Sequence, residues 1–253
     1  MTVSTQSILS ATGLTMEFRG FVAVNNVTLS VNEGTIHALI GPNGAGKTTV
    51  FNLLTKFLTP TRGRITFRGS DITTLKPAEV ARLGLVRSFQ ISAVFPHLTV
   101  LDNVRVALQR PSNLATQFWR SSSVLSGLDE RAMSLIDAVG LAGYAHLPAI
   151  ELSYGRKRAL EIATTLALDP AMLLLDEPMA GMGHEDIGRI SDLIRRIAKN
   201  RTVLMVEHNL HVVSDLCDRV TVLARGEILA DGTYDAVGAD PRVREAYMGT
   251  EHD

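Results

Sequence analysis

The first part of the chain has the hydrophobic pattern of a sheet followed by a glycine-rich loop. Residues 8–40 are strand-like, and apolar and polar side chains alternate over residues 27–31. Residues 35–40 form a nearly continuous apolar run, which is typical of a strand buried on both faces. A glycine-rich loop occupies residues 41–49, and the pattern after it predicts a helix over about residues 47–57.

The rest of the chain contains further predicted strands and helices. Apolar runs predict strands at residues 64–67, 85–89, 172–175, 202–206, 219–223 and 227–230. Apolar side chains recur at helical spacing over residues 187–197. Capping patterns at residues 99–102 and 126–129 precede amphipathic stretches, and Asp240 and Pro241 begin a final short helix.

Apolar strands that alternate with helices predict an α/β fold with a largely parallel sheet covered on both faces. The helical segment at about residues 91–165 interrupts this alternation, and we interpret it as a subdomain. Within it, the Ser-rich residues 111–126 are predicted to form a loop or an irregular insertion. The core is assigned to about residues 8–90 and 166–253, and residues 1–253 are taken as one domain.

Composition narrows the class of protein. The chain has 253 residues, and its 25 Lys and Arg against 26 Asp and Glu give a net charge of −1. This balance lacks the basic excess of a nucleic-acid-binding protein. The single cysteine, Cys217, excludes an internal disulfide framework and a four-cysteine zinc site, and it is typical of a reducing compartment. There is no run of about 18 apolar residues and no secretory signal, so we expect a soluble protein of the cytoplasm.

The strongest chemical signal is the glycine-rich loop. It satisfies the phosphate-loop pattern of Gly, four residues, Gly, Lys and Ser or Thr, through Gly41, Pro42, Asn43, Gly44, Ala45, Gly46, Lys47, Thr48 and Thr49. Glycines let successive backbone N–H groups surround a phosphate, and the helix N-terminus adds partial positive charge. Lys47 is expected to contact the β- and γ-phosphates, and Thr48 to ligate Mg²⁺. The alternative is a glycine-rich turn that contains a lysine, but a preceding buried strand and a following helix favour the nucleotide site.

Two carboxylates follow the strand predicted at residues 172–175. Asp176 lies at the carboxyl end of a buried strand, where α/β sheets bind ligands, and is suited to hold Mg²⁺. Glu177, one residue later, is suited to polarise an attacking water. Alone, such a pair is typical of a solvated loop. Together with a phosphate loop it predicts hydrolysis of a nucleoside triphosphate.

A third segment, Leu152-Ser153-Tyr154-Gly155-Arg156, lies just before a predicted helix and 24 residues ahead of Asp176. With this segment the chain resembles the ATPase subunits of ATP-binding-cassette (ABC) transporters, over about residues 8–249. The resemblance implies a phosphate-loop NTPase fold with a mixed or parallel sheet core, an N-terminal antiparallel β part and an inserted α-helical subdomain. It also implies ATP and Mg²⁺ as cofactors.

Further positions match residues that this family uses. The resemblance implies that Phe18 stacks on adenine, that Gln90 contacts Mg²⁺ together with Thr48 and Asp176, and that His208 is the switch histidine. Residues 180–183 occupy the position of the loop that crosses to a partner subunit. Taken singly, Phe18 is equally explained by strand packing, and Gln90 and His208 by ordinary polar positions at strand ends.

The resemblance implies a mechanism that needs two subunits. In the family, two ATPase subunits face each other head to tail and enclose two ATP molecules. Ser153 and the backbone N–H of Gly155 are expected to complete the γ-phosphate site of the opposite subunit. Glu177 is expected to orient or deprotonate water, and His208 to contact the γ-phosphate, with Lys47 as the third catalytic residue.

Within the family, the chain is most similar to the ATPases of branched-chain amino acid uptake. The supporting segments are residues 41–55, 86–90, 152–163, 177–182 and 240–249. We therefore expect an importer ATPase on the inner face of the cell membrane, in a homodimer or a heteropair, with separate permease subunits and indirectly a solute-binding protein. Other readings are a urea, amide or aromatic-acid importer, a lipopolysaccharide exporter, a soluble non-transport ABC protein or a metabolic kinase.

The sequence also departs from the family pattern, and one apolar segment has two interpretations. Arg156, Gly183 and Lys56 each replace a residue type that is more usual in the family. The apolar side chains after Gln90 are predicted either to receive a cytoplasmic helix of the permease or to belong to the helical core; they are Val94, Phe95, Pro96 and Leu98.

Overall fold

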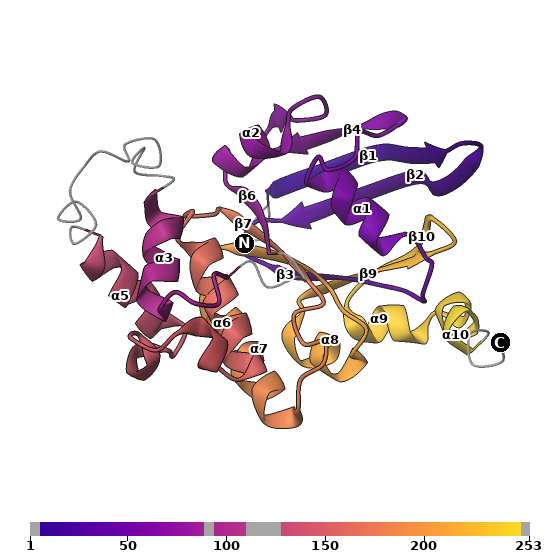
Figure 1. The fold of residues 1–253 in the computed structure, drawn as a ribbon. Helices are drawn as coiled ribbons and strands as arrows, with labels where there is room; N and C mark the ends of the chain where they lie inside the picture. Colours follow the sequence, from indigo (N-terminus) through magenta and orange to yellow (C-terminus); the bar gives the residue numbers. More distant parts are fainter. Residues whose placement is uncertain (1–5, 89–93, 110–127, 249–253) are drawn as a thin grey trace. The chain divides into compact units, whose positions relative to one another are not determined.

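The computed structural model describes residues 6–88, 94–109 and 128–248, and the chain divides into two compact units (Figure 1). The first unit comprises residues 1–87, 171–178 and 194–253. The second comprises residues 88–170 and 179–193.

An antiparallel sheet with the strand order β2-β1-β4-β5 belongs to the first unit. Its strands are β1 (Ser7–Phe18), β2 (Phe21–Asn32), β4 (Arg62–Phe67) and β5 (Ser70–Asp71). Strands β1 and β2 form a hairpin in which Phe18 pairs with Phe21. Both residues between them, Arg19 and Gly20, have positive φ values of 49° and 92°, as the twist of a two-residue hairpin turn requires.

A mixed sheet with the order β10-β9-β3-β8-β7-β6 forms the second layer of the same unit. Its strands are β3 (Ile36–Ile40), β6 (Leu85–Ser88), β7 (Met172–Asp176), β8 (Thr202–Val206), β9 (Arg219–Ala224) and β10 (Glu227–Gly232). Strands β3, β7 and β8 are buried at every position, which explains their continuous apolar sequences. Strand β3 pairs in parallel with β8 and β9, whereas β10 returns antiparallel to β9 as the predicted hairpin.

The helices of the first unit are α1 (Lys47–Leu54), α2 (Pro77–Arg82), α8 (Leu210–Leu216), α9 (Tyr234–Ala239) and α10 (Pro241–Met248). Helix α1 contributes Phe51 and Leu54 to a core that includes Leu9 and Phe67 of the antiparallel sheet. The helix ends at Leu54, so the predicted end near residue 57 is wrong. Lys56 adopts a left-handed φ of 65°, which cannot continue a right-handed helix.

The second unit is helical. It contains α3 (Val100–Gln109), α5 (Asp129–Ala138), the 3₁₀ turns η1 (Ala142–Tyr144) and η2 (Ala149–Glu151), α6 (Tyr154–Leu166) and the first part of α7 (His184–Ala198). The predicted cap of α3 is confirmed, because the Asp102 N–H donates to Thr99 Oγ1 at 3.0 Å. Arg105 of α3 binds Asp129 of α5 through two hydrogen bonds of 2.7 Å. The other predicted cap includes Ser126, which lies outside the described residues.

No helix in the described ranges is long and apolar enough to cross a membrane.

Candidate nucleotide site

The phosphate loop joins the buried strand β3 to helix α1, as the pattern predicted. Gly41 has a φ of +150°, and a Cβ added to it would lie 2.0 Å from the backbone oxygen of Leu223 in β9. Gly46, at the start of α1, has a φ of +99°, and its Cβ would lie 2.8 Å from the Ala23 oxygen. A side chain at either position would displace backbone, so these glycines fix the course of the loop between β3, β9 and β2.

A cavity of about 290 Å³ lies against this loop. It is lined by Phe21, Ala23, Asn43, Gly44, Ala45, Gly46, Lys47, Thr48, Thr49 and Glu177. The loop backbone, the N-terminus of α1, a lysine, a hydroxyl and a carboxylate thus converge on one space. A helix N-terminus with a lysine beside it favours an anion such as a phosphate.

The Lys47 side chain is held in place by backbone carbonyl groups of the phosphate loop. Its Nζ donates to the carbonyl oxygens of Gly41 at 2.6 Å and Pro42 at 2.9 Å. Burial lowers the pKa of Lys47 from its ordinary value, and the nearby charge of Glu177 opposes that shift. The ammonium group therefore points along the loop that would surround a phosphate.

Asp176 ends strand β7 as predicted, and it is engaged by an arginine that sequence reasoning missed. Arg87 Nη2 of β6 lies 2.5 Å from Asp176 Oδ2, and the two side chains are 9% and 4% exposed. Arg87 Nη1 also donates to Asn52 Oδ1 of α1 at 2.6 Å. Its guanidinium carbon lies 5.8 Å from the centre of the Phe51 ring. Arg87 thus links β7 to the helix that follows the phosphate loop.

Glu177 has an unusual backbone. Its φ of 44° lies in the left-handed region, which is costly for a residue other than glycine. The Glu177 N–H donates to the Val206 oxygen at the end of β8 at 3.0 Å, which holds the turn after β7. The half-buried Glu177 side chain consequently lines the cavity opposite the phosphate loop.

His208 directly follows β8 and is exposed. The buried Glu207 before it accepts hydrogen bonds from the N–H groups of His208 at 3.1 Å and Asn209 at 3.3 Å. Asn209 in turn caps α8 by accepting from the N–H groups of His211 and Val212. These contacts fix the turn, but His208 is not among the residues that line the cavity.

The predicted adenine contact has two aromatic candidates. Phe18 is 41% exposed at the end of β1, and Phe21 is 69% exposed at the start of β2. Only Phe21 is among the residues that line the cavity in the described part of the chain. Phe18 and Phe21 pair with each other across the hairpin. This pairing becomes evident only when the register of β1 and β2 is known.

The donors near the loop fit a magnesium ion that is shared with a nucleotide. Mg²⁺ is usually held by one or two carboxylates together with phosphates and waters. Thr48 is an exposed hydroxyl on the cavity, and Asp176 is the carboxylate at the end of β7. No group of three or more His, Cys, Asp or Glu side chains suited to a metal occurs among the described residues. Gln90, the third predicted ligand, lies outside them.

The second unit contains the predicted contacts to an opposite subunit. Ser153 is the N-cap residue of α6, and it is exposed and its side chain makes no capping hydrogen bond. Gly155 is buried, and a Cβ on it would lie 2.5 Å from Cγ of Asp186 in α7. A side chain at this position would therefore require the Asp186 side chain to move.

The sheet order, the loop and the converging Lys47, Thr48 and Glu177 define a phosphate-loop nucleotide-binding protein. The family described as ABC transporter matches residues 24–180, and the branched-chain amino acid ATP-binding cassette transporter family matches residues 227–253. The chain belongs to the ABC transporter ATP-binding family, as the sequence predicted.

Relatives of similar length support this assignment. The chain is 39% identical to the high-affinity branched-chain amino acid transport ATP-binding protein LivG of Escherichia coli K12, over 96% of this chain and 98% of that protein. It is 40% identical to BraF of Pseudomonas aeruginosa, described in the same words, with the same coverage of both chains.

A solved structure shows the same fold. An ATP-binding cassette of an ABC transporter in its ADP conformation superimposes with a TM-score of 0.85 and 31% identity. The match covers 97% of this chain and 100% of that one. The predicted fold class, an ABC ATPase with an antiparallel β part and helices in addition to the mixed sheet, is confirmed.

Proposed function

We propose that this protein is the ATP-binding and ATP-hydrolysing subunit of an ABC importer for branched-chain or related amino acids, working through a separate membrane permease. The observation that supports it most directly is the cavity where the phosphate loop, Lys47, Thr48 and Glu177 converge. The amino acid specificity is inferred from the match of residues 227–253 and from relatives whose names specify branched-chain amino acid transport.

The residues predicted to bind ATP and Mg²⁺ have distinct tasks in this proposal. Backbone N–H groups of the loop and Lys47 bind the β- and γ-phosphates. Thr48 and Asp176, with Gln90 as the third side chain, would hold a Mg²⁺ ion, which would supply positive charge to the phosphate oxygens. Glu177 orients the attacking water or accepts its proton, and His208 contacts the γ-phosphate.

A second ATPase subunit completes each site. The N-terminus of α6 offers an exposed Ser153 hydroxyl without a capping bond, next to the N–H of the buried Gly155. These donors and the partial positive charge of the helix are suited to the γ-phosphate held by the opposite subunit. The partner is a second copy of this chain or a sister ATPase, and the pair closes around ATP.

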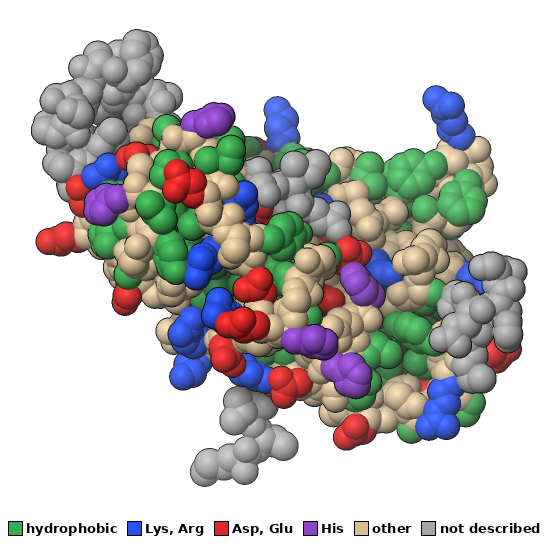
Figure 2. All heavy atoms as spheres, turned by 60° about the horizontal axis from the view of Figure 1, so that its bottom comes forward, with side chains coloured by type: hydrophobic (Ala, Val, Ile, Leu, Met, Phe, Trp, Pro, Cys, Tyr) green, Lys and Arg blue, Asp and Glu red, His purple; other side chains and the backbone are tan. Residues whose placement is uncertain are grey.

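An exposed apolar surface on the helical unit is suited to the permease. The Ile150 N–H donates to the Pro96 oxygen and the Ala149 N–H to the Leu98 oxygen, which joins residues 95–98 to residues 147–150. The large apolar side chains exposed on these two segments are Phe95, Leu98, Leu147 and Ile150. Figure 2 shows hydrophobic side chains at the surface among charged ones. We assign this surface to a cytoplasmic helix of the permease, which places the ATPase at the inner face of the cell membrane.

Reconstitution with the permease and its solute-binding protein tests the proposal. Leucine, isoleucine or valine should stimulate ATP hydrolysis by the reconstituted complex, and urea, amides and aromatic acids should not. Stimulation only by one of the other solutes would contradict the amino acid assignment. Phe95→Ala should abolish co-purification with the permease while ATP binding by the free chain survives. Retained co-purification would contradict the docking surface.

A further inference from the structure

A buried asparagine, Asn103, is bonded to the segment that carries half of the apolar docking surface. Asn103 lies in the first part of α3 and is 2% exposed. The tasks assigned above do not involve it. Asparagine is less favourable than most residues within a helix, because its side chain competes for backbone hydrogen bonds. At position 103, that side chain bonds to the backbone of the loop before the helix.

The Asn103 amide binds both polar groups of the Phe95 backbone. The Phe95 N–H donates to Asn103 Oδ1 at 2.7 Å, and Asn103 Nδ2 donates to the Phe95 oxygen at 3.0 Å. The same Nδ2 lies 2.9 Å from the Thr99 oxygen and 3.3 Å from the Leu98 oxygen. One buried side chain therefore holds the backbone at both ends of residues 95–99.

Residues 95–98 form a turn that Asn103 supports from one side. The Leu98 N–H donates to the Phe95 oxygen at 3.2 Å, which closes the turn. Pro96 occupies its second position, where the fixed φ of proline is favourable. The turn thus has a defined conformation although it belongs to neither a helix nor a strand.

The opposite side of the turn is held by residues 145–150. The Ala149 N–H donates to the Leu98 oxygen at 2.9 Å, and the Ile150 N–H donates to the Pro96 oxygen at 2.8 Å. The backbone of the turn is consequently bonded on two sides, once to a side chain and once to another segment. Neither set of bonds uses the apolar side chains of the turn.

These apolar side chains are left at the surface. Phe95 and Ile150 are each 53% exposed, and Leu147 and Leu98 are 40% and 38% exposed. Exposure of neighbouring large apolar side chains is unfavourable in water and is typical of a surface that a partner covers. Because the backbone beneath them is already fixed, a partner would bind them at a lower entropic cost.

We propose that Asn103 is a positioning residue of this docking surface, which holds Phe95 and Leu98 in the arrangement that binds a cytoplasmic helix of the permease. This inference rests on the proposed function, in which that helix covers the surface. Apolar side chains from two adjacent segments are suited to the apolar face of an amphipathic helix. Asn103 is buried beneath the turn and does not line the nucleotide cavity, so it acts through the turn alone.

Loss of the Asn103 amide should therefore lower the affinity for the permease and leave the chemistry of ATP unchanged. Without the amide, residues 95–98 would lose one of their two supports and would sample more conformations. Binding would then have to order the turn, and this ordering costs free energy. At a saturating concentration of permease the turn is ordered again, so the maximal rate should be retained.

Amide hydrogen exchange of the purified full-length chain, followed by NMR, tests the positioning itself. In Asn103→Ala, the amides of Phe95 and Leu98 should exchange at least about tenfold faster than in the wild type, because local opening of the turn becomes easier. Asn103→Asp keeps the size of the side chain but removes its donor N–H groups, and it should accelerate exchange at Leu98. Unchanged exchange in both variants would overturn the proposal.

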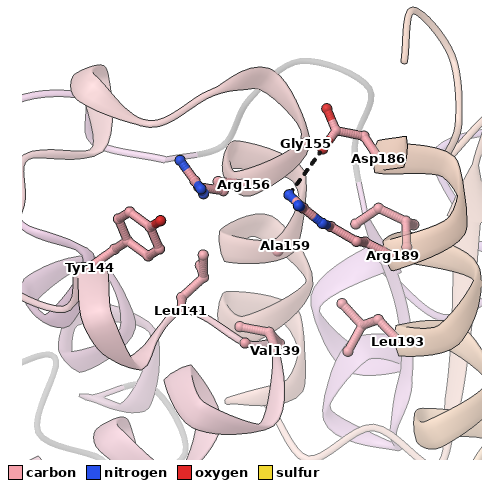
Figure 3. A pocket seen from close by; sticks show the side chains of 11 residues that line it. Val139, Leu141, Tyr144, Gly155, Arg156, Ala159, Asp186, Arg189 and Leu193 are labelled. Atoms are coloured by element: carbon pink, nitrogen blue, oxygen red, sulfur yellow. Dashed lines mark ion pairs between the residues drawn. The ribbon is translucent and has the colours of Figure 1, made fainter. Parts of the chain in front are cut away.

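Val139→Ala is the matched control. It truncates a buried side chain of the same unit, at a separate cavity of about 220 Å³ beside Arg156, which Figure 3 shows. This variant should leave exchange at Phe95 and Leu98 unchanged. Faster exchange of these two amides in Val139→Ala as well would show a general loss of stability and would contradict a specific task for Asn103.

Membrane vesicles test the consequence for the permease. Inside-out vesicles from the cells that produce this protein, stripped of peripheral proteins with urea, should bind the wild-type chain and stimulate its ATP hydrolysis. Asn103→Ala and Asn103→Asp should raise the half-saturating vesicle concentration at least about tenfold, and Val139→Ala should not. The maximal stimulated rate and the ATP affinity of the free chain should stay within about twofold of the wild type.

The outcomes separate this inference from the proposed function. Wild-type protein that fails to bind the vesicles, or binds protein-free liposomes of the same lipids equally well, would overturn the permease as the occupant and with it the proposed function. Wild-type binding that both Asn103 variants retain at full affinity would overturn only the task of Asn103. A loss of ATP affinity that parallels the loss of vesicle binding would likewise contradict that task.

Discussion

Replacement of Arg87 by methionine separates the structural task of this arginine from the nucleotide chemistry at Asp176. Arg87 and Asp176 form a buried ion pair of 2.5 Å, with side chains that are 9% and 4% exposed. Methionine keeps most of the length of the side chain but removes its charge and its hydrogen bond to Asn52. The variant therefore leaves the Asp176 carboxylate buried without its guanidinium partner.

Removing one partner of a buried ion pair costs about 3–5 kcal/mol in the free energy of unfolding. For a chain of this size, such a loss corresponds to a fall in Tm of roughly 6–20 °C. Arg82→Met is the matched control, because Arg82 is exposed on α2 and the same charge is removed. We expect its Tm to remain within a few degrees of the wild type, as for most surface substitutions.

Magnesium and ATP should offset part of the loss in the Arg87→Met protein. A cation held by Asp176 and the nucleotide phosphates supplies positive charge where the guanidinium is missing. Thermal unfolding followed by circular dichroism, with and without Mg-ATP, should thus show a larger stabilisation by Mg-ATP in Arg87→Met than in the wild type. ATP with a chelator should not reproduce this difference. The reasoning is refuted if Arg87→Met and Arg82→Met lose the same stability, or if Mg-ATP stabilises Arg87→Met and the wild type equally.

Three further predictions follow from single residues. Gly155→Ala should cost little stability, because the atoms that its Cβ would meet at 2.5–2.8 Å all belong to the partly exposed Asp186 side chain, which can rotate away; a large fall in Tm that Asp186→Ala relieves would refute this reasoning. His37, fully buried in β3, has its pKa lowered to about 4 by burial, so its neutral form is favoured in the folded state. The free energy of unfolding should hence fall as pH decreases from about 6.5 to about 4, by about 3 kcal/mol, and His37→Gln should lack this part of the pH dependence in urea titrations; identical slopes would contradict it. Lys47→Ala should weaken ATP binding at least about tenfold with an unchanged circular dichroism spectrum, and an unaltered affinity would refute the role of the phosphate loop.

The predicted elements that proved correct rest on local signals. Continuous apolar runs identified β3, β7 and β8, since a strand covered on both faces has no polar side to show. The cap at Thr99 and the phosphate loop could also be predicted, because a few neighbouring residues determine each of them.

The features that sequence reasoning missed depend on contacts between distant residues. Arg87 and Asp176 are 89 residues apart, and only the adjacency of β6 and β7 in the sheet brings them together. The position of Phe21 at the cavity depends on the register of the β1–β2 hairpin. Likewise, the cavity beside Arg156 forms only because α5, α6 and α7 pack around it. Hydrophobic periodicity in one segment contains no information about which other segment it meets.

The Glu177→Gln variant tests the central claim, hydrolysis of ATP by a closed pair of subunits, most directly. The substitution keeps the shape of the side chain that lines the cavity but removes the carboxylate that would orient or deprotonate water. In the presence of Mg-ATP, light scattering after size-exclusion chromatography should show a stable dimer, and phosphate release should fall to a small fraction of the wild-type rate. Hydrolysis at the wild-type rate, or a chain that remains monomeric with ATP bound, would contradict the account.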